Sequence, residues 1–87
     1  MLLHLGGGFT VDSGRLVMFT DLSRPVAAST RKLLEGLQKQ GRIQRLPGRA
    51  ATLVLCQHQG QLYGIYSPIG LRTLRLRAQP PLNCLDP

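Results

Sequence analysis

Residues 62–78 read LYGIYSPIGLRTLRLRA. This stretch gives the clearest signals for secondary structure and for function, so the other segments are placed relative to it. A strand carrying tyrosine and isoleucine is predicted to end at Ser67-Pro68, because proline cannot donate a hydrogen bond to a sheet. Leucines then interleave with arginines, so we expect one side of a short element to enter the core while the other displays cations. Residues 71–78 fit a strand and a helix equally well, because periodicity does not decide over so short a span.

The segment before this stretch is predicted to supply its partner strand. Residues 52–57 have an apolar centre, and Gln59-Gly60-Gln61 is typical of a chain reversal, so residues 52–57 and 62–67 form a predicted hairpin. Residues 42–46 indicate a weaker strand, in which Ile43 is the clearest inward residue.

The first half of the chain is predicted to add three strands and a helix. Residues 2–5 and 9–11 are strands joined by a tight reversal at the three glycines between them. Residues 16–19 are apolar throughout and are predicted to form a central strand buried on both faces. A helix over residues 29–40 is expected to begin with Ser29 as its N-cap and to stop at the glycine that follows.

This order of elements predicts an α+β fold with a small, mostly antiparallel sheet and one main helix. In a chain of 87 residues we expect one domain over residues 1–79 and a flexible, proline-containing tail over residues 80–87. A chain this short buries a modest fraction of its surface, and its two cysteines are no disulfide framework. Self-association into a homo-oligomer is therefore expected to add burial.

The charge of the chain indicates an anionic partner. Eleven lysines and arginines against four acidic residues give a formal net charge of +7. Only two of the eleven are lysine, a bias toward bidentate recognition of phosphate. No acidic residue lies between Glu35 and Asp86. Nucleic acid is therefore the leading partner class, and an anionic membrane surface is the second.

Five arginines are the candidate DNA-binding residues. Two of them flank glycine-containing turns, from which a side chain can reach a partner, and three belong to the segment 71–78. The set consists of Arg15, Arg49, Arg72, Arg75 and Arg77. Any one of them is also compatible with an ordinary solvated surface charge. Because no helix-turn-helix, zinc finger or RNP motif is present and aromatic residues are few, duplex binding through phosphates is favoured over base stacking.

Recognisable catalytic and cofactor-binding patterns are absent from the sequence. Cys56-Gln57-His58 offers one thiol and one imidazole, which is short of the usual zinc ligands. No Lys-Ser/Thr pair follows the triple glycine, so it is not a Walker loop. We therefore expect no enzyme activity, cofactor, metal or small-molecule substrate. With no secretory signal and no apolar run of about 18 residues, we expect a cytoplasmic protein without a membrane partner.

The chain resembles a known family over residues 1–79. The segments that carry the resemblance are Leu3-His4-Leu5-Gly6-Gly7, Leu16-Val17, Leu33-Leu34-Glu35, Tyr66-Ser67-Pro68-Ile69, Thr73-Leu74-Arg75 and Arg77-Ala78-Gln79. Their order and spacing resemble the small bacterial extracellular-matrix regulators typified by RemA and RemB, and the last segment looks closest to the RemB branch. The resemblance implies ring-shaped homo-oligomers that display arginines to duplex DNA. It also implies a nucleoid-associated transcriptional regulator of biofilm matrix genes, with Arg15 and Arg49 near basic turns of the RemA branch.

Two alternatives to DNA binding stay open at this point. One is an oligomeric scaffold that does not bind DNA and uses its arginines between subunits. The other is a small RNA-binding accessory protein, which competition between duplex DNA and RNA would reveal.

Overall fold

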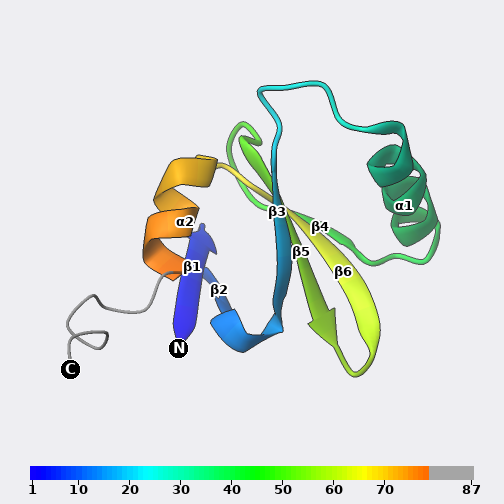
Figure 1. Ribbon diagram of the computed structural model, residues 1–87. Helices are drawn as coiled ribbons and strands as arrows, with labels where there is room; N and C mark the ends of the chain where they lie inside the picture. The colour runs from blue at the N-terminus through cyan, green and yellow to red at the C-terminus, as the bar shows by residue number, and fades with distance from the viewer. Residues whose placement is uncertain (79–87) are drawn as a thin grey trace, which may run out of the picture.

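The computed structural model describes residues 1–78, which form six strands, a short 3-10 helix and two α-helices (Figure 1). In chain order the elements are β1 (Leu2–Gly6), β2 (Phe9–Asp12), η1 (Ser13–Arg15), β3 (Leu16–Asp21), α1 (Ala28–Lys39), β4 (Ile43–Arg45), β5 (Thr52–His58), β6 (Gln61–Ser67) and α2 (Leu71–Ala78). The predicted α+β class is confirmed, with a second helix that the sequence had left undecided. The predicted tail over residues 80–87 lies outside the described residues.

The strands form two sheets. β1 and β2 make a two-stranded antiparallel hairpin, and the other four strands lie in the order β3-β5-β6-β4. β5 is antiparallel to both β3 and β6, whereas β4 runs parallel to β6. The predicted mostly antiparallel sheet and both predicted hairpins are therefore confirmed.

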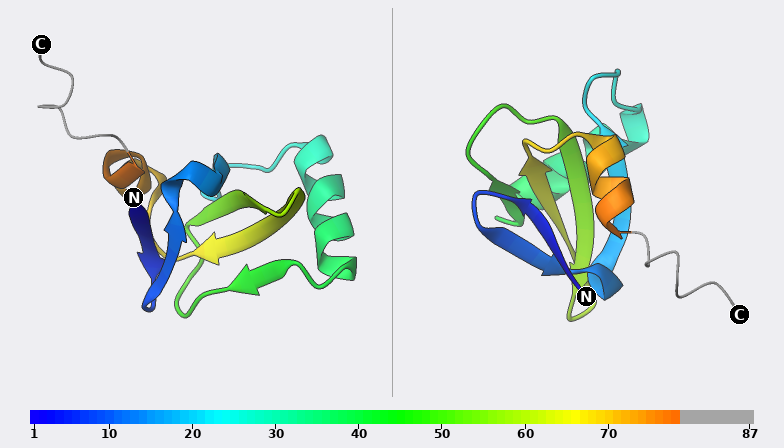
Figure 2. Two further views of the ribbon diagram at one scale, coloured as in Figure 1. Left: turned by 90° about the horizontal axis from the view of Figure 1, so that it is seen from below. Right: turned by 90° about the vertical axis from the view of Figure 1, so that its left-hand side faces the viewer.

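The β1–β2 hairpin and α2 cover one face of the four-stranded sheet, which we call the hairpin face (Figures 1 and 2). Side chains alternate along a strand, so Leu3 and Leu5 of β1 point inward while their neighbours are exposed. They pack with Val54 and Ile65 of the sheet and with Leu74 of α2 in one core cluster. Three separate elements are thus joined by a single apolar core.

Two buried polar side chains fix the point where β6 ends. The Ser67 hydroxyl donates a hydrogen bond to the Leu5 carbonyl and accepts one from the Ile69 N–H at 3.1 Å. The Thr52 hydroxyl donates to the Ile69 carbonyl at 2.7 Å. Since both groups are satisfied, burying them carries little desolvation penalty. The predicted strand end at Ser67-Pro68 is confirmed, and α2 is oriented by this connection.

The opposite face of the sheet, which we call the α1 face, is only partly covered. α1 contacts β4 and β6 but no residue of the helix except Leu37 is fully buried. Gly64 makes room for this contact, since a Cβ on it would lie 2.7 Å from Ile43 Cδ1. Away from the helix, Met18 of β3 keeps 42% of its surface exposed.

The prediction of a central, two-sided strand at residues 16–19 is wrong. β3 is an edge strand, and its residue Val17 is 53% exposed at an irregularity in the pairing with β5. The two interior strands are β5 and β6, and the first five residues of β5 are all buried. An apolar run indicates a strand but does not tell its place in the sheet, because strand order depends on partners distant in sequence.

Two further expectations about the helices need correction. Ser29 is not an N-cap: α1 begins at Ala28, and its N-cap Ala27 makes no side-chain hydrogen bond. Alanine has the highest helix propensity, so the helix extends past the serine. In α2 only Leu74 is fully buried, while Leu76 is 63% exposed. The helical turn therefore separates leucines that a strand would have placed on one face.

Candidate nucleic-acid interface

The lysine and arginine side chains lie at the surface and lack acidic partners. All eleven fall within residues 1–78, and none of them forms an ion pair in this described part of the chain. Its one ion pair joins the Met1 ammonium group to the Asp12 carboxylate at 3.6 Å. No lysine or arginine is therefore held in a close ion pair within this part of the chain.

Three of the five candidate arginines gather at one end of the molecule, in what we call the α2 surface: Arg49, Arg72 and Arg75. Arg49 follows the turn at Gly48, whose φ of +102° requires glycine. Arg49 and Leu71, the first residue of α2, line the same hollow of about 510 Å³. Arg72 and Arg75 are exposed and share a helix face, since residues three apart are neighbours.

The other two candidates are set apart from this surface. Arg77 donates a hydrogen bond from Nη1 to the His4 carbonyl at 3.3 Å, so its guanidinium lies against β1. Arg15 ends η1, which Asp12 caps by accepting a hydrogen bond from the Gly14 N–H at 3.0 Å. The whole length of β3, roughly 17 Å for six residues, separates Arg15 from the end that carries Arg49.

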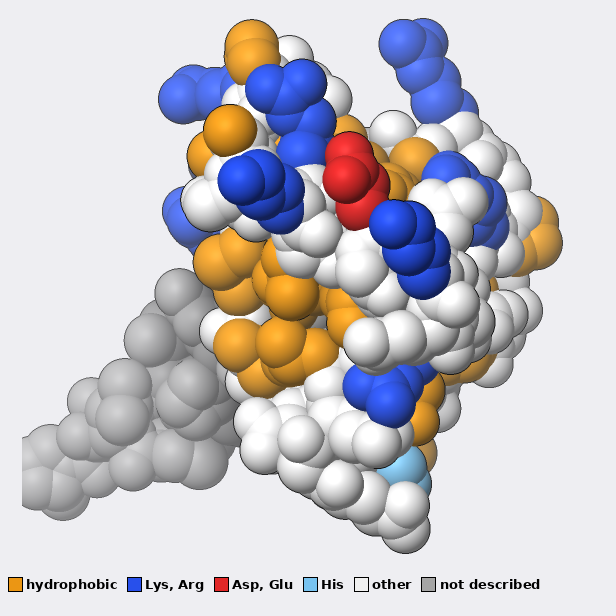
Figure 3. Space-filling view, turned by 90° about the vertical axis from the view of Figure 1, so that its right-hand side faces the viewer, with side chains coloured by type: hydrophobic (Ala, Val, Ile, Leu, Met, Phe, Trp, Pro, Cys, Tyr) orange, Lys and Arg blue, Asp and Glu red, His pale blue; other side chains and the backbone are white. Residues whose placement is uncertain are grey.

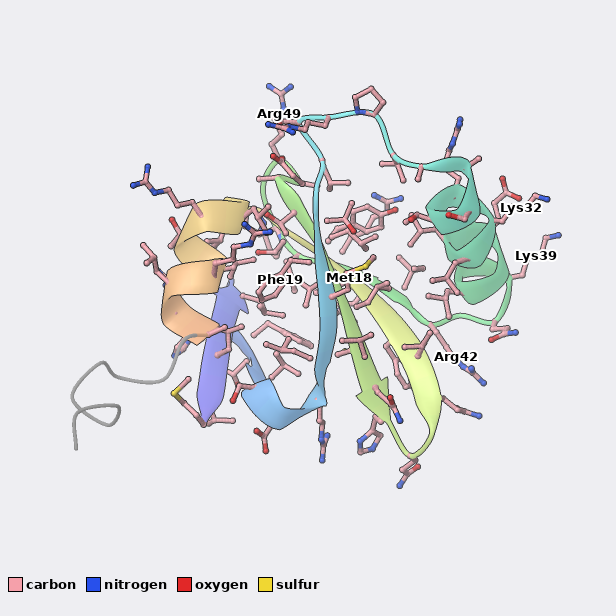
Figure 4. The ribbon with its side chains drawn as sticks, viewed as in Figure 1. Met18, Phe19, Lys32, Lys39, Arg42 and Arg49 are labelled. Atoms are coloured by element: carbon pink, nitrogen blue, oxygen red, sulfur yellow. The ribbon has the colours of Figure 1, made fainter. Side chains whose placement is uncertain are left out.

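A second group of cations, which we call the α1 surface, was not among the candidates. It comprises Arg31, Lys32, Lys39 and Arg42. Figure 3 shows basic side chains spread over this side of the molecule around a single acidic one, and Figure 4 shows Lys32 and Lys39 pointing away from the sheet. Helical spacing could have found two of them, because Lys32 and Lys39 lie opposite the leucine stripe of the predicted helix.

Each of the two tyrosines of β6 has an arginine guanidinium over its ring. The Arg45 guanidinium lies 4.4 Å from the ring centroid of Tyr66, and that of Arg42 lies 5.9 Å from the ring centroid of Tyr63. Cation–π contacts of this kind cover aromatic faces. Each arginine would therefore compete with an unpaired base for one face of its tyrosine ring.

A groove of about 670 Å³ lies between the hairpin and the sheet. Arg15, Arg42, Cys56 and Tyr63 contribute to its lining. Burial raises the pKa of the Cys56 thiol, against a smaller opposing effect of Arg15. The thiol is therefore neutral near pH 7, consistent with its interpretation as a small core residue.

Residues 1–78 hold no group of three or more His, Cys, Asp or Glu side chains that could ligate a metal ion. Neither helix in this part of the chain is long and apolar enough to cross a lipid bilayer. No family model and no curated protein matches the chain. Charge and geometry are therefore the properties that bear on its function.

Proposed function

We propose that this chain is a non-enzymatic transcriptional regulator that binds duplex DNA as a homo-oligomer. The observation that carries the proposal is the set of eleven basic side chains without an acidic partner in residues 1–78, in a chain of net charge +7. A protein whose cations meet phosphates releases condensed counterions, which drives binding regardless of base sequence. Cations that are not paired within the protein are free to act in this way.

The α2 surface is the proposed contact with the phosphate backbone. Its three arginines come from a turn and from a face of α2, and the buried Leu74 anchors this helix in the core. Planar guanidiniums suit bidentate contact with phosphate oxygens. Arginines already stacked on Tyr63 and Tyr66 argue for a duplex rather than single-stranded nucleic acid, which relies on free aromatic faces.

Assembly into a homo-oligomer would raise the affinity for duplex DNA above that of a single copy. One copy offers few phosphate contacts, whereas a ring of copies repeats them along a duplex, so that the contacts add as a multivalent site. Sequence preference in such a complex comes largely from how easily the DNA bends. The resemblance to the extracellular-matrix regulators makes matrix genes the proposed target class and the nucleoid the proposed location.

A salt titration of DNA binding tests the proposal. Fluorescence anisotropy with a labelled duplex, repeated at several salt concentrations, is expected to give an affinity that falls steeply with salt. The double variant R72A/R75A removes two cations from the α2 surface and is expected to flatten the log–log salt slope by about 1.8. The matched control R31A/K32A removes the same charge from the α1 surface and is expected to change the slope less.

The outcomes separate the competing interpretations. Binding that is absent or independent of salt overturns the proposal and favours the oligomeric scaffold. Equal losses in the two double variants would assign binding to total charge rather than to the α2 surface. Unlabelled RNA that competes better than unlabelled duplex DNA would favour the RNA-binding alternative.

A further inference from the structure

The two edges of the four-stranded sheet are protected to very different degrees. The β4 edge has three residues and carries Arg45, with Arg42 just before it. Short length and charge are the usual ways to stop an edge strand from pairing with another chain. The β3 edge has six residues, reads LVMFTD, and contains no lysine, arginine or proline. β3 has one irregularity, between Leu16 and Met18, but it is longer than β4 and lacks basic residues, so it is the less protected of the two edges.

We propose that β3 pairs antiparallel with β3 of a second copy of this chain, so that Arg15 of each copy lies beside Asp21 of the other. The sheet would then continue across a two-fold axis as eight strands, twice the four of one copy. This inference deepens the assembly in the proposed function by naming one of its contacts. It needs no DNA and stands or falls separately from DNA binding.

Charge selects both the partner and the direction of pairing. Arg15 immediately precedes β3 and Asp21 ends it, so antiparallel pairing brings opposite charges together at both ends of the strand. A parallel pair would instead place like charges side by side. Neither residue has an ion-pair partner within residues 1–78. The strand is thus complementary to itself in one direction only.

Both charged groups also belong to the same side of the sheet. Asp21 pairs with Thr52, which lies two and four residues from Val54 and Cys56 of the hairpin-face core. Arg15 lines the groove together with Cys56. Residues opposite each other in an antiparallel pair share a face, so the two side chains are placed to meet.

The middle of β3 supplies apolar contact to the same interface. Val17 and Met18 are 53% and 42% exposed, and both would be near the two-fold axis. Figure 4 shows Met18 and Phe19 on opposite sides of the strand. α1 lies on the same face as Met18 but contacts β4 and β6, at the opposite edge of the sheet, and so leaves Met18 of β3 accessible. Pairing would therefore bury apolar surface that a single copy exposes.

Charge exchange tests the pairing directly. Sedimentation velocity without DNA, over a range of protein concentrations, would compare the wild type with R15D, D21R and the double variant R15D/D21R. Each single reversal is expected to weaken self-association about tenfold or more, because it places like charges at both ends of the pair. The double variant keeps the net charge of the chain and is expected to restore association.

K32D is the matched control, since it reverses one charge on the α1 surface, where Figure 4 shows the side chain pointing away from the sheet. It is expected to leave self-association unchanged. Circular dichroism would establish that each variant is folded, and hydrogen exchange of the β3 amides would follow pairing in the wild type itself. These amides are expected to become more protected as protein concentration rises.

Failure of R15D/D21R to recover association, or β3 amides whose protection ignores concentration, would overturn the inference. DNA binding measured on the same samples separates the two proposals. A wild-type protein whose association depends on the β3 charges but which does not bind DNA contradicts the proposed function alone. A protein that binds DNA with a steep salt slope but shows no effect of the β3 charges contradicts the pairing alone.

Discussion

The two faces of the four-stranded sheet differ sharply in how they are covered. On the hairpin face, Leu3, Leu5 and Leu74 are at most 1% exposed. On the α1 face, Leu33 of α1 is 37% exposed and Met18 of β3 is 42% exposed. The contrast teaches that the α1 face leaves apolar side chains such as Met18 exposed, although Leu53 and Leu55 beneath it are buried.

The largest effect is expected at the centre of the hairpin-face core. Leu74→Ala is expected to lower the free energy of unfolding by about 2–5 kcal/mol, because it leaves a cavity between α2 and the sheet. Leu76→Ala, two residues along the same helix, should change it by less than about 0.5 kcal/mol. Urea unfolding at one fixed protein concentration measures both. Similar losses in the two variants would contradict the assignment of Leu74 alone to the core.

A smaller effect is expected from the hydroxyl that joins β1 to β6. Ser67→Ala removes a buried donor and acceptor, leaving the Leu5 carbonyl and the Ile69 N–H without their partner. A loss of about 1–3 kcal/mol is expected. Ser29→Ala is the control: Ser29 is exposed and caps no helix, so urea unfolding should show almost no change. A large fall in the free energy of unfolding of Ser29→Ala would instead indicate that Ser29 caps the helix.

The smallest effect concerns the exposed acid at the end of β3. Hydrogen bonds from the Ser23 N–H and hydroxyl hold the pKa of the Asp21 carboxyl below its ordinary value. A lowered folded-state pKa stabilises the fold above the unfolded-state pKa, and this contribution is lost as pH falls below about 4. The Tm of Asp21→Asn should therefore fall less than the Tm of the wild type when the pH is lowered from about 6 to about 3. Identical pH dependences would show that these hydrogen bonds do not favour the charged form.

Local patterns predicted the hairpin face well. The alternation in residues 2–5, the reversal at the triple glycine and the strand end at Ser67-Pro68 all follow from neighbouring residues, and all three are confirmed. The α1 face was predicted less well. Ser29 was expected to be the N-cap, but the helix begins one residue earlier, at Ala28. β3 was expected to be central, but it is an edge strand.

The candidate site divides in the same way. The acid-free run of arginines is visible in the sequence, and so is the position of Arg49 beside a glycine turn. Which arginines lie together is not visible there. Arg49 lies near the start of α2 because β6 returns the chain past the turn before β5, whereas Arg15 lies at the far end of β3.

Composition and short-range patterning alone determine that this chain is strongly basic, belongs to the α+β class and turns where glycine and proline occur. These properties depend on residues within a few positions of one another, so they can be read before folding is considered. The edge position of β3, the helical state of residues 71–78 and the grouping of the arginines were decided by tertiary contacts. Each depends on partners tens of residues away, such as Leu5 with Ser67, and the burial gained there outweighs local preference.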